Sequence, residues 1–274
     1  MTLYVRSPAL IPKPHDWKSH IAISGFCHLP LATSYVPSPS LLEFLESGPQ
    51  PIYIGFGSIV VSDPLALSKI VLQAVEKAGV RAIISRGWGS FAANEMEIRS
   101  NVFTVDDVPH DWLFSKVSCV VHHGGAGTTA AGIAAGKPTV IVPFFGDQPF
   151  WGLAVARAGA GPEPLPFKEL TSDSLAAGII TALQSEVCKK AIALGQTMNE
   201  EAGTVEAAKS FHDSLNIDAL RCSLSPNRTA VWRLKNTNIR LSALSATVLI
   251  GENLLKPGDI KRLASLDKML LFNC

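Results

Sequence analysis

The sequence predicts an α/β protein in which a parallel sheet is covered by helices on both faces. Three observations support this fold class: short β-rich runs alternate with helical segments, glycines follow several of the runs, and the alternation continues over residues 51–215. Strands that alternate with helices form parallel sheets, because each crossover helix packs back on the sheet. We therefore expect one doubly wound domain over residues 51–215.

Residues 1–50 and 216–274 differ from this central region. The first segment is rich in proline and serine and has one strand-like run, "HIAISGF", so we expect a strand and a linker without a core of their own. The last segment is basic and then amphipathic, and we expect a helical C-terminal extension. Eight Lys/Arg and two Asp/Glu between Arg221 and Arg262 give this extension a charge of +6. Its basic residues form either a solvated face or a contact with another domain or an anionic membrane surface.

Composition narrows the class of protein. With 47% hydrophobic and 17% charged residues, the chain is typical of soluble globular proteins. A net charge of +1 favours no nucleic-acid partner. The five cysteines are scattered, which suits a reducing compartment better than a disulfide framework. We see no signal-peptide pattern and no apolar run of about 18 residues, so we expect a cytoplasmic location.

The central region opens with the run "PIYIGFGS", which predicts a buried strand entering a glycine turn. A helix follows, with Asp63 as its cap, Pro64 at its first position and Gly79 after its end. "RAIISRG" and "NVFTVDDV" predict two more strands, and "HDWLFSK" a short helix.

The second half of the region continues the alternation. "SCVVHHG" predicts a strand, "AGTTAAGIAAG" a helix, "PTVIVPF" a strand and "QPFWGLAVARAG" a helix. "TSDSLAAGIITALQ" and "SEVCKKAIALGQTMNEEAGTVEAAKSFHDSL" predict two further helices.

The glycine-rich stretch "HHGGAGTTAAG", from His122 to Gly132, predicts an anion site. A strand that delivers a glycine turn to a helix N-terminus presents free amides and the positive end of the helix dipole. Thr128 and Thr129 add hydroxyl donors, so the stretch suits a pyrophosphate. Neighbouring residues of a strand face opposite sides, so we expect His123 to meet the phosphates and His122 to pack behind the loop.

Two other phosphate motifs fit less well. A Walker A loop is excluded, because "GIAAGKP" is one residue short and ends in proline. The dinucleotide fingerprint is met by Gly125, Gly127 and Ala130, with Asp147 lying 20 residues past Gly127. That fingerprint belongs after the first strand of its domain, whereas this turn follows about the fourth. An NAD(P)-binding domain therefore stays as an alternative hypothesis.

Several motifs in order, "PIYIGFGSI", "SRGW" and "HHGGAGTTAAGIAAGKPTVIVPFFGDQPFWG", resemble the donor-binding half of the family 1 UDP-dependent glycosyltransferases of the GT-B fold. Among these, the sequence looks most like the fungal sterol 3-beta-glucosyltransferases. The resemblance covers about residues 1–215, and the tail from Val231 is similar to extensions on fungal homologues. It implies a Rossmann-like domain that binds a UDP-sugar.

The resemblance also implies roles for single residues. Around the nucleoside, Trp88 lies beside the uracil, Val108 offers backbone groups to the base, and His110 lies close to the nucleotide. Around the diphosphate and sugar it implies two groups: Ser58, His123, Ala126, Gly127 and Thr128 near the phosphates, and Asp147 and Gln148 on the sugar hydroxyls. Structural alternatives are a core aromatic at Trp88, a helix cap at His110, and ordinary turn residues at Asp147 and Gln148.

The reaction implied by the resemblance is an inverting transfer from UDP-glucose to the hydroxyl of a sterol or other lipid, without a metal. We see no DxD pair or His/carboxylate cluster suited to a divalent ion. In this family the catalytic base and the acceptor pocket belong to an N-terminal domain, of which residues 1–50 match only the last strand and the linker. We therefore assign no catalytic residue in this chain and expect it to be inactive alone. The alternative is a stand-alone nucleotide-sugar-binding module, catalytically silent or working with a separate acceptor subunit.

Overall fold

The computed structural model describes residues 2–28, 34–87 and 99–263. The chain divides into two compact units, residues 1–210 and 211–274. The first unit contains a five-stranded sheet with its helices, and the second contains a small three-stranded sheet. Each unit is described by itself below.

The sheet of the first unit is parallel throughout, with the order β5-β4-β3-β6-β7. Its order reverses between β3 and β6, which makes the edge beside them a topological switch point. The predicted α/β fold class is therefore confirmed. The strands are β3 (Ile52–Gly55), β4 (Ala82–Ser85), β5 (Val102–Val105), β6 (Val120–His122) and β7 (Thr139–Ile141).

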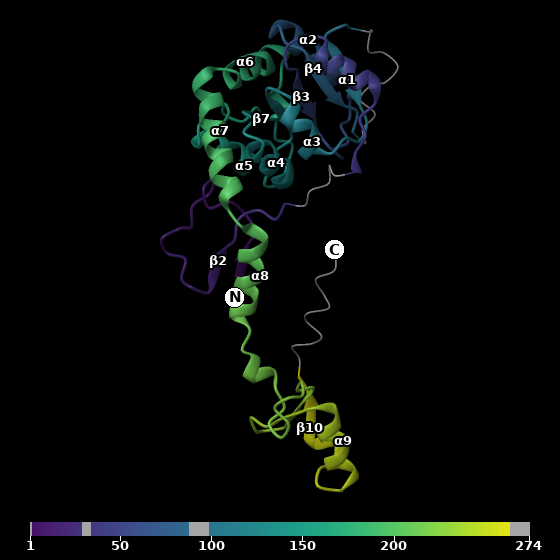
Figure 1. Cartoon of the computed structure of the whole chain (residues 1–274), viewed down its shortest axis with the longest axis vertical. Coiled ribbons are helices and arrows are strands. Elements are labelled where there is room, and N and C mark those ends of the chain that lie inside the picture. Colours follow the sequence, from purple (N-terminus) through teal and green to yellow (C-terminus); the bar gives the residue numbers. More distant parts are fainter. Residues whose placement is uncertain (1, 29–33, 88–98, 264–274) are drawn as a thin grey trace. The chain divides into compact units, whose positions relative to one another are not determined.

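Helices surround this sheet (Figure 1). A side-chain cap and a proline at the helix start recur in this unit: Asp63 accepts from the Ala66 amide at 2.9 Å before Pro64. Ser38 caps the first helix in the same way, within the segment that was expected to hold only a strand and a linker. These helices are α1 (Pro39–Glu46), α2 (Pro64–Lys77), α3 (His110–Leu113), α4 (Ala126–Ala134), α5 (Gln148–Arg157), α6 (Ser172–Ala182) and α7 (Ser185–Glu200), with the 3-10 turns η2 (Phe114–Lys116) and η3 (Phe167–Glu169). A further helix, α8 (Gly203–Ser214), begins in the first unit and ends in the second.

The side chains of β3 alternate between two hydrophobic cores, one on each face of the sheet. Ile52 and Ile54 are fully buried in one cluster with residues of α2 and α6. Tyr53, between them, belongs to the opposite cluster with Leu113 and Phe114. Because side chains of a strand alternate between faces, the sheet is covered on both sides, and Tyr53 projects toward α3.

The N-terminal segment interrupts a predicted helix. One continuous helix was expected over residues 185–215, but α7 ends at Glu200 and α8 begins at Gly203. The carboxylate of Glu201 accepts from the Ser7 hydroxyl at 2.7 Å and from the Ala9 amide at 3.2 Å. A side chain at Gly203 would overlap the carbonyl of Phe26. The segment, which carries the parallel pair β1 (Thr2–Tyr4) and β2 (Ile21–Ile23), therefore sets the break.

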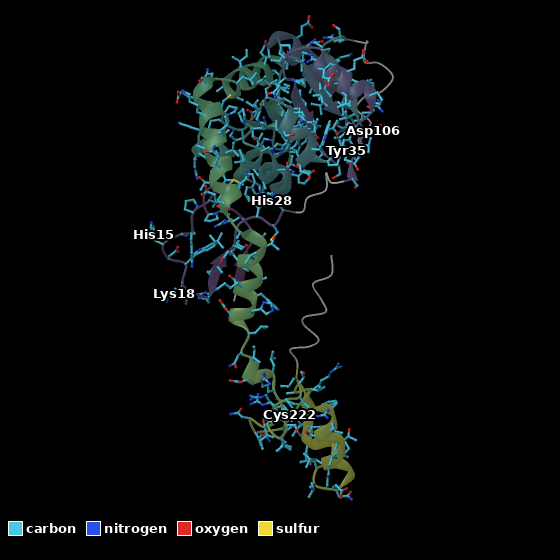
Figure 2. The ribbon with its side chains drawn as sticks, viewed as in Figure 1. His15, Lys18, His28, Tyr35, Asp106 and Cys222 are labelled. Atoms are coloured by element: carbon cyan, nitrogen blue, oxygen red, sulfur yellow. The ribbon has the colours of Figure 1, made fainter. Side chains whose placement is uncertain are left out.

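The second unit corrects the prediction of a helical tail. Its described residues include an antiparallel sheet of order β10-β8-β9 and the helix α9. Asn236 takes the left-handed conformation (φ 58°) between β8 and β9, where the helical prediction had placed no turn. Cys222, shown in Figure 2, is buried with its Sγ 3.4 Å from the Ser245 hydroxyl. The elements are β8 (Trp232–Leu234), β9 (Arg240–Leu241), β10 (Ile260–Arg262), α9 (Ala243–Gly251), η4 (Ile217–Leu220) and η5 (Pro257–Asp259).

Candidate functional site

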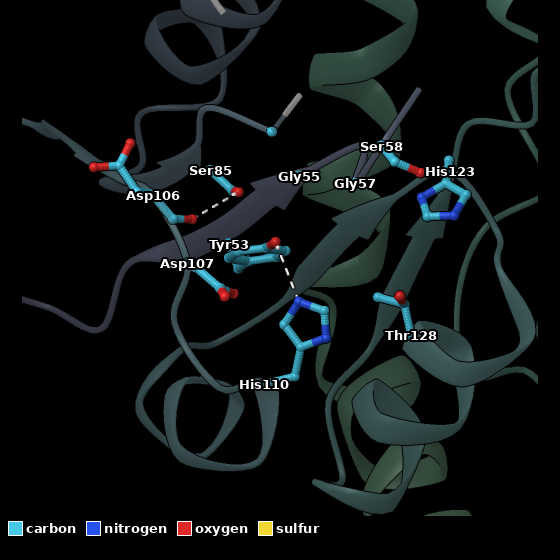
Figure 3. Close-up of a pocket in the computed structure, with 11 residues that line it drawn as sticks. Tyr53, Gly55, Gly57, Ser58, Ser85, Asp106, Asp107, His110, His123 and Thr128 are labelled. Carbon is cyan, nitrogen blue, oxygen red and sulfur yellow. Dashed lines mark hydrogen bonds between the residues drawn. The ribbon is translucent and has the colours of Figure 1, made fainter. Parts of the chain in front are cut away.

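A cavity of about 410 Å³ opens at the carboxyl ends of β3, β4, β5 and β6 (Figure 3). This is the switch-point edge of the sheet, where ligands of doubly wound folds bind. Its position follows from topology, because every loop that leaves a parallel strand emerges on the same side. The lining residues are Tyr53, Gly55, Gly57, Ser58, Ser85, Gly87, Asp106, Asp107, His110, His123 and Thr128.

Glycines hold the turns after β3 and β4 close together. Gly57 and Gly87 have φ angles of +64° and +58°, which side-chain-bearing residues rarely adopt. A Cβ on Gly87 would lie 2.5 Å from the Gly57 carbonyl oxygen, and a Cβ on Gly55 would overlap the Tyr53 hydroxyl. Bare backbone at these three positions therefore lets the cavity form.

His122 packs behind the glycine loop, as predicted. Its side chain is fully buried, and its Nδ1 accepts a hydrogen bond from the Gly124 amide at 2.9 Å. Gly124 has φ +91°, and a Cβ there would meet Ile141 and the Gln148 carbonyl at 2.8 and 3.0 Å. Burial lowers the pKa of His122 to about 3, so the ring is neutral and serves as a structural acceptor.

The N-terminus of α4 is open toward the cavity. Its N-cap, Gly125, supplies no side-chain hydrogen bond to the first turn. Thr128 and His123 both line the cavity, and the buried Nδ1 of His123 has no partner among the residues that the structure describes. A hydroxyl and an imidazole thus meet at the end of the cavity beside the uncapped start of α4.

Thr129 corrects one expectation. It was expected to add a second hydroxyl donor, but it is fully buried and its hydroxyl donates to the Gly125 carbonyl at 2.9 Å. Helical geometry explains the difference, because consecutive residues point about 100° apart and only Thr128 faces the cavity.

The other end of the cavity is built by Tyr53 and His110. The Tyr53 hydroxyl lies 3.4 Å from His110 Nε2. Burial raises the pKa of Tyr53 to about 12. Burial also lowers the pKa of His110, more than Asp107 and Asp111 raise it. Both groups are therefore uncharged at neutral pH and can give or accept hydrogen bonds without attracting or repelling a phosphate.

Five other predicted residues, all of them described, lie outside the cavity lining. Gly127 is exposed, while Val108 and Ala126 pack partly into apolar clusters. The Asp147 carboxylate accepts from Trp151 Nε1 at 2.8 Å, and the buried Gln148 accepts from the Phe144 and Phe145 amides at 2.7 and 3.1 Å. Trp88 lies outside the described residues.

Seven lining residues were not singled out from the sequence. They share one feature: each lies in the last residues of a predicted strand or directly after it, at the edge where parallel strands deliver their loops. A second signal was membership of the motifs "PIYIGFGSI" and "SRGW", which contain all of these residues except the two aspartates. The seven residues are Tyr53, Gly55, Gly57, Ser85, Gly87, Asp106 and Asp107.

The described residues hold neither a cluster of metal-ligating side chains nor a helix that could span a membrane. No three His, Cys, Asp or Glu side chains come together there in a way that could hold a metal ion. None of the helices in the same residues combines the length and apolar character that crossing a membrane requires.

Comparison with known proteins identifies relatives of the chain. Residues 89–210 match the family described as "Erythromycin biosynthesis protein CIII-like, C-terminal domain". The sterol 3-beta-glucosyltransferase UGT80A2 of Arabidopsis thaliana is 47% identical over 212 residues, which is 77% of this chain and 33% of that protein. The sterol 3-beta-glucosyltransferase of Aspergillus fumigatus is 40% identical over 224 residues, 78% of this chain and 16% of that protein. The chain thus spans a third or less of these relatives.

Solved structures agree on the fold. A UDP-glucose: anthocyanidin 3-O-glucosyltransferase in complex with UDP superposes with a TM-score of 0.56 at 20% identity, covering 70% of this chain and 46% of that one. The glycosyltransferase VinC in complex with DTDP gives a TM-score of 0.60 at 22% identity, covering 77% and 51%. The fold, the motifs and the sequence identities together show that the chain is a C-terminal, donor-side part of the family 1 UDP-dependent glycosyltransferases, related to the sterol 3-beta-glucosyltransferases.

Proposed function

We propose that the first unit binds the nucleotide of a UDP-hexose, UDP-glucose in the first instance, for inverting transfer to a sterol or other lipid hydroxyl. The observation that carries this proposal is the uncapped N-terminus of α4, which opens on the cavity beside Thr128 and His123. A diphosphate is the ligand that such a helix end favours, because its amides and its dipole both attract negative charge.

The phosphate end can do chemical work as well as binding. When the bond from sugar to diphosphate breaks, negative charge grows on the leaving oxygens. Donors already aimed at that charge lower the barrier, by about 3–4 kcal/mol for a single donor in comparable sites. We assign this role to the first-turn amides of α4, the Thr128 hydroxyl and His123, with Ser58 beside His123 in Figure 3. In this proposal they supply the charge stabilisation that a metal supplies in other enzymes.

The proposal also assigns contacts with the hexose and the uracil to residues that are not among those lining the cavity. Asp147 and Gln148 remain proposed partners of the hexose hydroxyls, through the polar atoms that their own hydrogen bonds leave free. Ala126 and Gly127 would contribute main-chain amides, which survive any change of side chain. Val108 and Trp88 remain proposed neighbours of the uracil.

Complete transfer needs an acceptor site and a general base. We propose that both come from protein outside this chain, in the larger part of the relatives' length that the chain does not span. The purified chain should then bind UDP and UDP-glucose without transferring sugar. Robust transfer by the chain alone would show that its base lies within these residues.

Calorimetry with UDP, UDP-glucose and NADH tests the donor site directly. We expect binding of the two uridine nucleotides and none of NADH. Replacing Thr128 by alanine should weaken UDP binding, whereas replacing the exposed His28, which does not line the cavity (Figure 2), should leave it unchanged. NADH binding without UDP binding would replace this function with a dinucleotide-binding one.

A further inference from the structure

The cavity has two chemically different ends (Figure 3). Ser58, His123 and Thr128 gather at the end beside α4, where donors predominate. Asp107 stands at the other end, with its carboxylate directed toward Tyr53 and His110. A diphosphate is attracted to the first end and repelled by the carboxylate at the second. The ligand therefore has one favourable orientation, with its nucleoside toward Asp107.

Asp107 differs from the aspartate that precedes it. Asp106 forms an ion pair with Arg86, whose Nη1 lies 2.9 and 3.2 Å from the two carboxylate oxygens. Figure 3 shows its carboxylate turned away from Tyr53. Asp107 makes no hydrogen bond or ion pair with the residues that the structure describes, and its charge acts on both Tyr53 and His110. One of two adjacent carboxylates is thus structural, and the other is available inside the cavity.

A nucleoside diphosphate offers two kinds of donor to a free carboxylate. The uracil edge has one N–H between two carbonyl oxygens, and a carboxylate there would set an oxygen against at least one of them. The ribose offers two adjacent hydroxyls, which match the two acceptor oxygens of a carboxylate. Dinucleotide-binding folds use an acidic residue on ribose hydroxyls for the same reason.

We propose that Asp107 binds the 2′ and 3′ hydroxyls of the donor's ribose and thereby selects ribonucleotides over 2′-deoxyribonucleotides. This inference rests on the proposed function, because it assumes that a uridine nucleotide occupies the cavity. Tyr53 and His110 form the neutral polar wall beside the ribose. Gly55, which bears no side chain, leaves room for the Tyr53 hydroxyl to reach that wall.

The test compares UDP with 2′-deoxy-UDP on the full chain and on Asp107→Ala, by calorimetry at constant pH and salt. For the unmodified chain we expect UDP to bind about tenfold or more tightly than 2′-deoxy-UDP, since a hydrogen bond to a charged group is worth that much. Asp107→Ala should bring the two ligands within about twofold of each other. Any long-range effect of removing the charge acts on both ligands alike and cancels in their ratio.

Asp106→Ala is the matched control: it removes the neighbouring carboxylate and should keep the preference for UDP. Thermal unfolding of both variants checks that each is folded, and Asp107→Asn, which keeps one acceptor oxygen, should give an intermediate ratio. UDP binding with an unchanged preference in Asp107→Ala overturns this inference and leaves the proposed function standing. Absence of UDP binding to the unmodified chain overturns both.

Discussion

Two neighbouring strand–turn–helix motifs of the first unit, β6–α4 and β7–α5, share one topology and use their polar groups in opposite ways. Each begins with a buried three-residue strand and delivers its helix at the same sheet edge. Neither helix start has a side-chain cap, but in β6–α4 the side chains of His123 and Thr128 line the cavity. In β7–α5 the carboxylate of Asp147 and the amide oxygen of Gln148 are bound to Trp151 and to backbone amides of the turn.

The difference shows what turns a helix N-terminus into a ligand site. Parallel topology brings every such N-terminus to the same edge of the sheet, so position alone does not separate the two motifs. What separates them is whether the polar side chains beside the helix start are already bound within the protein. Asp147 and Gln148 hold their own turn, whereas His123 and Thr128 line the cavity and remain for a ligand. Substitutions should therefore affect nucleotide binding in β6–α4 and the stability of the fold in β7–α5.

The largest expected effect is at the glycine that closes the first turn. Gly124→Ala places a side chain at φ +91° and in contact with Ile141 and the Gln148 carbonyl. We expect the free energy of unfolding to fall by roughly 2–4 kcal/mol, measured by urea denaturation. Gly127→Ala is the control, because no atom lies within 4 Å of its added Cβ. Equal losses at both positions would mean that the turn is not constrained as described.

The next largest expected effect is a contrast between the two motifs, in which one substitution lowers stability and the other lowers affinity for UDP. Gln148→Ala leaves the Phe144 and Phe145 amides without their acceptor and should lower the free energy of unfolding by about 1–3 kcal/mol. Its affinity for UDP should change little, whereas Gln148→Glu should keep most of the stability by keeping an acceptor.

Thr128→Ala should show the reverse pattern, with stability within about 0.5 kcal/mol and UDP affinity reduced about tenfold. Calorimetry and urea denaturation of the same preparations give both quantities. If Gln148→Ala lost UDP binding while Thr128→Ala lost only stability, the roles assigned to the two motifs, binding for β6–α4 and stability for β7–α5, would be wrong. Repeating the titrations with UDP-glucose tests the proposed sugar contact of Gln148 separately.

The pH dependence of the free energy of unfolding tests the structural role of His122 in the first unit. Burial lowers its pKa to about 3 in the folded protein, against about 6.5 when unfolded. Its contribution is fully present above pH 6.5 and is lost between pH 6.5 and 3, by at most about 1.4 kcal/mol per pH unit, because only the unfolded chain takes up the proton.

His122→Asn keeps an acceptor for the Gly124 amide and removes the titration. Urea midpoints from pH 7 to 4 should therefore fall less steeply in this variant than in the unmodified chain. Burial also lowers the pKa values of His110 and His123, and these act with the same sign in both proteins, so the difference reports His122. Parallel pH profiles would contradict the structural role given to this ring.

The smallest expected effect belongs to Asp147. Asp147→Ala removes the acceptor of the Trp151 Nε1–H bond and should lower the free energy of unfolding by about 1 kcal/mol, since the carboxylate is exposed. Asp147→Asn retains an acceptor oxygen and should lie close to the unmodified chain. Intrinsic fluorescence of the unfolding transition measures both. A loss from Asp147→Asn as large as from alanine would assign the effect to charge at the helix start.

Local signals predicted most of the first unit. Asp63, Pro64 and Gly79 marked one helix from both ends, and the apolar runs located the five parallel strands. Long-range contacts were harder to predict. The break before Gly203 depends on Ser7, and the use of Gln148 as a turn acceptor depends on the loop's path. Of the candidate site, the phosphate end carried a motif, whereas Asp107 and Tyr53 became neighbours only through the pairing of β3, β4 and β5.

The bond from Ser7 to Glu201 joins residues 194 positions apart, which has a consequence for synthesis on the ribosome. Along the chain, Ser7 is translated before the strands of the five-stranded sheet, and Glu201 is translated after them. This bond can therefore close only once the whole sheet has been made.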